Sequence, residues 1–417
     1  MTANGGALAS FFFRLGKKVW VRAALFTLIG IAVALIAGFL GPFLPFDVTI
    51  DLGQNAVGSL LQIIATAMLT VSTFSVTAMV TAFSAATTTA TPRSTPLLIA
   101  DTTSQNAVST FIGAFTYSLV GIVALSTPYY TEQGRTILFV GTLVVIGIVV
   151  FTLLRWISHL STFGRMADVI DRVEKAATAA LEMHASSPTL GARALTTVPG
   201  GTRAVLTDQV GYVTHVDVRA LHRLAEDHDV RIYVDATPGR IADARTPLVR
   251  VAGAVDDDLV KAVRRAFRIE NHRTFEQDPR FGVIALTEIG SRALSPATND
   301  PGTAIEVIAA LQRVLTRAIT IEPDHEVTYA RVFLEPAELR DLVADAFRPL
   351  ARDGAPHIEV QVRLQKCLAS LAASAPRHAE AFRDAARAAF ERSRRDLDRN
   401  DVRLLRTSMR EAWNEAG

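Results

Sequence analysis

The sequence predicts an α-helical membrane protein with four transmembrane helices and a cytoplasmic α+β domain, made of a small β-rich module and a helical C-terminal part. Long apolar runs fill the chain as far as Trp156, whereas nearly all Lys, Arg, Asp and Glu residues come later. Of the 417 residues, 49% are hydrophobic and only 20% are charged. This uneven distribution divides the chain into a membrane part and a soluble part.

Four apolar stretches have the length of about 20 residues that a helix needs to cross a bilayer. They are Val19–Leu44, Val57–Phe83, Val108–Thr127 and Ile137–Trp156. Basic residues lie before the first stretch (Arg14, Lys17, Lys18) and at or after the end of the fourth (Arg155, Arg165, Arg172, Lys175). Because positive residues stay on the cytoplasmic side, we expect a multi-pass protein of the inner (plasma) membrane with both termini cytoplasmic. The first stretch is too long for a cleavable signal peptide and is expected to stay in the membrane.

The order of the parts follows from these stretches. We expect a cytoplasmic N-terminus over residues 1–18, a transmembrane domain over 19–158, an amphipathic helical connector over 159–190, the β-rich module over 191–255 and a helical cytoplasmic domain over 256–417.

The second stretch carries a row of polar residues spaced three or four apart. This spacing follows the helical period, so the side chains share one face of the helix. The row consists of Ser59, Gln62, Thr66, Thr70, Thr73, Thr77, Thr81 and Ser84. We call these eight residues the polar stripe.

Two interpretations of the polar stripe compete. Small hydroxyl residues allow close helix–helix approach, so the stripe could be an interface. Hydroxyls can also replace part of the hydration shell of an ion, so the stripe could line a pathway for ions or solutes. Four helices are too few to enclose a continuous aqueous hole, and the pathway therefore requires a homo-oligomer that contributes one stripe per subunit.

The connection after the second stretch contains Arg93 between Pro92 and Pro96, followed by Asp101. The prolines exclude a regular helix there, and Arg93 and Asp101 could pair across the turn. At the inner mouth of a channel, a ring of Arg93 residues would attract anions. The alternative is an ordinary positive anchor at the lipid headgroups.

The soluble part begins with an amphipathic helical segment, and short β-branched runs such as Val230–Val234 then alternate with Gly and Pro turns. These runs predict the β-rich module. From Asp256 onward the pattern is helical to the end of the chain, and Asp278-Pro279 and Asp300-Pro301 each pair a capping residue with proline at the first helical position.

The stretch "RALSPATNDPGTAI" therefore predicts a rigid corner between two helices. Amide groups left free at a helix N-terminus favour anions. The candidate regulatory or anion site comprises Arg273, Arg292, Ser295, Asn299, Asp300 and Thr303. A tight interhelical turn without a ligand is the alternative.

The run from Arg273 to Ala304, "RTFEQDPRFGVIALTEIGSRALSPATNDPGTA", resembles the signature of a bacterial family of predicted membrane proteins classed as a domain of unknown function, DUF2254. Arg93, Asp101, Gln105 and "FIGAFTY" (Phe111–Tyr117) resemble its membrane signature. The resemblance implies a multi-span membrane protein with a cytoplasmic domain, and it implies no catalytic residues or substrate.

Enzyme and metal motifs are missing from the sequence. The nine histidines do not cluster at metal-ligand spacing, there is no GxSxG motif, and "VPGGTR" lacks the Lys-Ser/Thr ending of a phosphate loop. The single cysteine, Cys367, excludes an internal disulfide. The net charge of +2 gives no whole-molecule argument for nucleic-acid binding. We therefore expect no enzyme activity, cofactor, metal or nucleic-acid partner.

The sequence thus favours a homo-oligomeric channel or pore-like transport protein, with the lipid bilayer, its own copies and a small ion or anionic ligand as partners. The polar stripe would line the pathway, and the cytoplasmic domain would be a vestibule or ligand sensor. The alternative is a non-conducting membrane-anchored sensor or scaffold.

Overall fold

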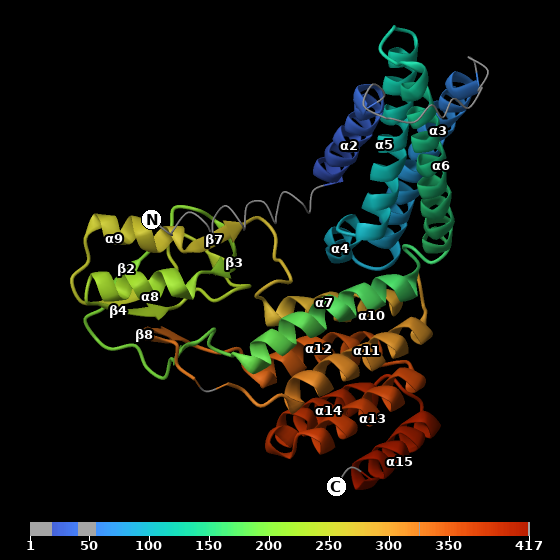
Figure 1. Cartoon of the computed structure of the whole chain (residues 1–417). Coiled ribbons are helices and arrows are strands. Elements are labelled where there is room, and N and C mark those ends of the chain that lie inside the picture. The colour runs from blue at the N-terminus through green and yellow to red at the C-terminus, as the bar shows by residue number, and fades with distance from the viewer. Residues whose placement is uncertain (1–18, 41–55, 325, 416–417) are drawn as a thin grey trace. The chain divides into compact units, whose positions relative to one another are not determined.

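The computed structural model describes residues 19–40, 56–324 and 326–415 (Figure 1). The expected N-terminus over residues 1–18 and the first connection, with Asp47 and Asp51, lie outside the described residues. Within the described part, the chain forms two compact units. The membrane unit contains the apolar helices. The C-terminal unit contains the chain from Val169 onward together with the short segment Thr89–Ser94.

Four helices of the membrane unit are long and apolar enough to cross a membrane. They are α2 (Val19–Leu40), α3 (Ala56–Thr89), α5 (Thr102–Leu125) and α6 (Glu132–Leu160), and a short helix α4 (Thr95–Ile99) precedes α5. The predicted apolar spans are therefore confirmed, although α3 and α6 are longer than the apolar runs. Thr131 begins α6 because its side chain accepts a hydrogen bond from the amide of Gly134 at 3.2 Å.

Glycines allow the membrane helices to approach closely. A Cβ atom on Gly30 of α2 would lie 2.7 Å from the carbonyl oxygen of Gly113 on α5, and one on Gly121 would lie 2.9 Å from Leu61 of α3. Tyr117 lies between Gly113 and Gly121 in the sequence of α5, and its hydroxyl donates to the carbonyl of Leu138 on α6 at 3.1 Å. The small residues Gly113 and Gly121 thus let α5 pack closely against its neighbouring helices.

The α/β part of the C-terminal unit follows α7 (Met166–Ser186) and contains two sheets. A five-stranded sheet has the order β1-β8-β4-β6-β2, and a three-stranded sheet has the order β5-β3-β7. The strands are β1 (Ala192–Ala194), β2 (Arg203–Val205), β3 (Gly211–Val216), β4 (Arg231–Val234), β5 (Ile241–Ala242), β6 (Val249–Ala252), β7 (Phe267–Glu270) and β8 (Tyr329–Leu334). Helices α8 (Val218–Asp227) and α9 (Asp257–Arg265) share one core with both sheets.

The expectation that the chain is helical from Asp256 onward is wrong at β7 and β8. β7 pairs with β3, and β8 lies between β1 and β4 with parallel pairing on both sides. Val332 and Leu334 of β8 are buried in the core of the α/β part. The module predicted over residues 191–255 is therefore completed by strands from beyond its predicted end.

The helical part of the C-terminal unit stacks six helices (Figure 1). They are α10 (Pro279–Ala293), α11 (Pro301–Thr320), α12 (Leu339–Asp353), α13 (Ile358–Ser374), α14 (Ala379–Ser393) and α15 (Arg399–Glu415). Fully buried residues such as Ile289, Val307 and Leu364 form their core. Asp278 and Asp300 cap α10 and α11, with proline at the start of each helix, as the sequence predicts.

Candidate functional site

The polar stripe lies on the exposed side of α3. All eight of its residues are exposed in the protomer, whereas the buried residues of α3, including Leu61, Met68 and Met79, occupy the nearly opposite face. The stripe therefore does not seal α3 against other helices of the same protomer within the described residues. A helix–helix interface built from the stripe requires a second copy or another protein.

The threonines of the stripe bond to their own helix. The hydroxyls of Thr66, Thr70, Thr73, Thr77 and Thr81 each donate to the carbonyl four residues earlier at 3.0 Å. This bond satisfies the hydroxyl donor without a partner helix. The oxygen keeps its lone pairs, so each threonine presents a hydrogen-bond acceptor outward.

Arg93 and Asp101, expected at an inner mouth, are not paired with each other. Arg93 lies in a short 3-10 turn (η2, Pro92–Ser94), and its guanidinium donates to the carboxylate of Glu288 on α10. The Thr91 hydroxyl donates to the same carboxylate oxygen at 3.1 Å. Asp101 instead caps α5, accepting from the amide of Ser104 at 2.7 Å, and its carboxylate lies 2.9 Å from Nε2 of His159.

The corner between α10 and α11 has the predicted geometry. The Asp300 carboxylate accepts from the amide of Thr303 at 3.1 Å and from its hydroxyl at 2.6 Å, and these bonds lower the pKa of Asp300. Asn299 adopts a left-handed conformation with φ of 47°, and its amide donates to the carbonyl of Ser295 at 2.8 Å. These bonds are internal to the turn.

Arg273 does not join this corner. It lies ahead of the N-terminus of α10, whereas Arg292 and the corner lie at the other end of this 15-residue helix, roughly 20 Å away along its axis. The structure therefore brings together Arg292, Ser295, Asn299, Asp300 and Thr303 but separates Arg273 from them.

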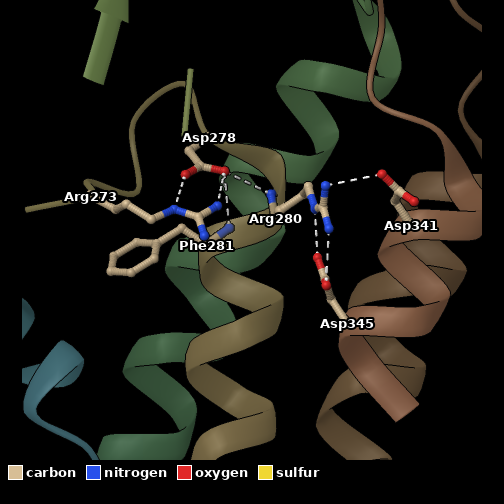
Figure 2. Close-up of polar contacts among 6 residues, drawn as sticks. All are labelled: Arg273, Asp278, Arg280, Phe281, Asp341 and Asp345. Atoms are coloured by element: carbon tan, nitrogen blue, oxygen red, sulfur yellow. Dashed lines mark hydrogen bonds and ion pairs between the residues drawn. The ribbon is translucent and has the colours of Figure 1, made fainter. Parts of the chain in front are cut away.

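Arg273 forms a buried ion pair with Asp278 instead (Figure 2). Its Nε and Nη2 atoms donate to the two carboxylate oxygens at 2.6 and 2.9 Å. Asp278 also accepts from the amides of Arg280 and Phe281 as the cap of α10, and its side chain is only 2% exposed. The guanidinium carbon lies 5.3 Å from the centre of the Phe281 ring. Such a pair is fixed by two parallel hydrogen bonds.

Gly239, in the connection from β4 to β5, lies directly against this ion pair. A Cβ atom there would be 2.4 Å from a carboxylate oxygen of Asp278, and Gly239 has a φ of +91°. Both observations require glycine. The α/β part and the helical part of the C-terminal unit therefore meet at Asp278.

Arg280 continues the network to α12 (Figure 2). It forms two bonds with Asp345, at 2.6 and 3.1 Å, and one with Asp341 at 3.0 Å. The hydrogen bond to Asp345 raises the pKa of Arg280. The sequence Asp278-Pro279-Arg280 at the start of α10 thus bonds on one side to Arg273, which follows β7. On the other side it bonds to the carboxylates of Asp341 and Asp345 on α12.

A cavity of about 400 Å³ lies at this network. Arg240, Arg273, Glu335 and Glu338 supply charged groups to its lining, and His184 of α7 also faces it. Burial lowers the pKa of His184 below its ordinary value, which favours the neutral imidazole. No group of His, Cys, Asp and Glu side chains suited to a metal occurs in the described part of the chain.

Gly239, His184 and Arg280, which line this cavity, are not among the site residues predicted from the sequence. The sequence could have pointed to Arg280, because this residue directly follows the capping pair Asp278-Pro279. Gly239 and His184 come from segments distant in sequence, and no spacing links them to Arg273.

Comparisons with known proteins agree with the described spans. The predicted membrane protein family DUF2254 matches residues 16–370. Uncharacterized proteins Rv1290c of Mycobacterium tuberculosis and Mb1321c of Mycobacterium bovis are each 45% identical over 62 residues, which is 15% of this chain and 12% of each relative. No solved structure matches the chain significantly. Because the family match covers most of the sequence, the chain belongs to the DUF2254 family of predicted membrane proteins.

Proposed function

We propose that this protein is a homo-oligomeric channel or pore-like transport protein of the cell membrane, with the polar stripe of each subunit turned toward a shared pathway. The observation that carries the proposal is the exposure of all eight stripe residues on one face of a 34-residue apolar helix. The opposite face of α3 is already buried. A subunit arrangement that covers the stripe therefore adds to the protomer fold without rearranging it.

Gln62 gives this proposal its energetic argument. The threonine donors are satisfied within α3, so those side chains could face lipid at modest cost. The Gln62 side chain is exposed and has no hydrogen bond among the described residues. An unsatisfied amide in hydrocarbon costs several kcal/mol, which favours water or another subunit beside it.

The chemistry of the pathway follows from the threonine bonds. With five hydroxyl protons directed at backbone carbonyls, the stripe presents mainly oxygen lone pairs. Acceptor oxygens suit water and cations better than anions. The stripe itself carries no formal charge.

The C-terminal unit would act as the ligand-sensing part of such a protein. Its cavity at Arg273 and Arg280 is enclosed by segments from both the α/β part and the helical part, and pockets between structural parts often bind small molecules. The alternative function is a membrane-anchored sensor or scaffold in which the same stripe joins subunits without conduction.

The test compares flux and assembly in one set of variants. Full-length protein in liposomes should release a trapped monovalent cation, and Thr73→Phe should reduce this flux to background while the oligomer elutes unchanged in detergent. Val76→Phe is the matched control, because Val76 is 47% exposed on α3 but lies outside the stripe. Flux that persists in Thr73→Phe, or a wild-type protein that is monomeric, rejects the pathway. Loss of assembly in Thr73→Phe favours the scaffold.

A further inference from the structure

The five-stranded sheet has one face in the core and one face turned away from it. Ile232 and Val234 of β4 and Val332 of β8 are buried in the core with α8 and α9. Because side chains alternate along a strand, their neighbours Tyr233 and Phe333 point to the other face. We call this second face the outer sheet face.

The strand register assembles a row of four side chains across the outer sheet face. Arg193 of β1 is opposite Phe333, Phe333 is opposite Tyr233, and Tyr233 is opposite Arg250 of β6. The Phe333 and Tyr233 rings stack with their centres 4.7 Å apart and their planes inclined by 18°. Two aromatic rings therefore lie between two arginines.

A second pair of arginines, Arg231 and Arg331, lies on the same face two residues before Tyr233 and Phe333. The pairing of Ile232 with Val332 places Arg231 beside Arg331. Like charges on directly opposite residues of neighbouring strands cost stability. A bound anion would offset this cost.

The outer sheet face has an excess of positive charge. Arg331 pairs with Asp229 at 2.7 Å and Arg250 pairs with Asp235 at 3.0 Å. Arg193 and Arg231 are exposed, and neither has an ion-pair partner among the residues that the structure describes. Four arginines against two aspartates leave two positive charges.

The same face is concave. A hollow of about 710 Å³ is lined by Arg193, Arg231, the hydroxyl residues Thr196 and Thr197, and Phe333, among others. Its surface thus combines unpaired guanidinium groups, hydroxyls and an aromatic ring within one site. Guanidinium groups bind phosphate through paired hydrogen bonds, and aromatic side chains on a sheet are platforms for nucleobases.

We propose that the outer sheet face binds a nucleoside phosphate, with the phosphates held by Arg193 and Arg231 and the base placed over Phe333. This proposal is independent of conduction through the polar stripe. The proposal requires that both the phosphates and the base of the ligand contribute to binding, since the arginines alone would bind any polyanion.

The test uses the full-length protein in detergent with ATP as the probe and inorganic triphosphate as a ligand that lacks the nucleoside. ATP should bind saturably and more tightly than triphosphate. Arg193→Ala/Arg231→Ala should weaken ATP binding by at least about tenfold, and Arg377→Ala/Arg383→Ala, which removes two exposed arginines elsewhere, should leave it unchanged. Phe333→Leu should weaken ATP binding without changing triphosphate binding.

Three binding results would overturn the proposal. They are the absence of saturable ATP binding, triphosphate binding as tight as that of ATP, and equal losses of ATP binding in the two double-arginine variants. Dissociation of the oligomer in Arg193→Ala/Arg231→Ala would also overturn it, because the outer sheet face would then be a contact between copies. Arg193 and Arg231 are exposed and unpaired within the described residues, so their removal should leave the fold intact.

Discussion

Glu288 of α10 accepts hydrogen bonds from both Arg93 and Thr91, two residues of the connection between α3 and α4. The connection that follows the polar stripe in the chain is therefore held by a helix of the C-terminal unit.

Glu288→Gln should loosen the connection without unfolding the protein. The side chains of Arg93 and Glu288 are 44% and 34% exposed, so the loss in unfolding free energy should be no more than about 1 kcal/mol. Hydrogen exchange should become faster at the amides of Arg93 and Ser94. The same exchange rates in Glu288→Gln and in the surface variant Glu380→Gln would show that the contact does not hold the connection.

Asp278→Ala should destabilise the C-terminal unit strongly. It would leave Arg273, only 19% exposed, without its carboxylate, and removing one partner of a buried pair costs about 3–5 kcal/mol. Thermal unfolding of the full-length protein measures the effect. A midpoint within error of wild type would contradict the role of this ion pair in joining the two parts of the unit.

Gly239→Ala should also be destabilising, by about 1–3 kcal/mol or more, since it combines a positive φ with a clash against Asp278. Gly200→Ala is the matched control, because a Cβ atom on Gly200 has no neighbour within 4 Å. Denaturant unfolding of both variants tests the difference, and equal midpoints would refute the steric argument.

Gly30→Val should weaken the membrane unit, because a side chain there would meet the carbonyl of Gly113. Overpacking of this kind costs about 1–3 kcal/mol. Gly147→Val on α6 should be tolerated, since nothing lies within 4 Å of its added Cβ atom. Thermal unfolding midpoints of the two variants in detergent test this difference. Equal midpoints would contradict the close α2–α5 contact.

His184 should make stability depend on pH. Burial lowers its pKa below the ordinary 6.5, so the unfolded chain takes up a proton at a higher pH than the folded chain. The stability gained from the neutral imidazole is complete above pH 6.5 and is lost as the pH falls through the folded pKa. The unfolding midpoint of His184→Gln should therefore fall less than that of wild type on acidification, with the exposed His378→Gln as control.

The sequence was most informative where one short stretch determines a feature. The apolar runs predicted the membrane helices, and each Asp-Pro pair predicted a helix start, because capping and proline act over a few residues. The polar stripe follows from helical spacing alone, and its exposure in the protomer required the fold.

Long-range pairing could not be predicted in the same way. β8 begins 135 residues after the end of β1, its parallel neighbour, and a short strand between helices has no distinctive local pattern. The partners of Arg273 and Arg93 depend on the folded positions of α10 and its neighbours. Local motifs therefore pointed to Arg93 and Arg273 but not to their partners, Glu288 and Asp278.

Water access along α3 tests the central claim most directly. Cysteines at Thr66, Thr73 and Thr77 should react with a membrane-impermeant thiol reagent in liposomes, and the reaction at Thr73 should stop ion flux. A cysteine at Val76 is the control and should react poorly. Native Cys367 gives little background because it is fully buried and burial raises its pKa to about 12. If the cysteines at all three stripe positions react as poorly as the cysteine at Val76, water does not reach the stripe and the protein does not conduct through it.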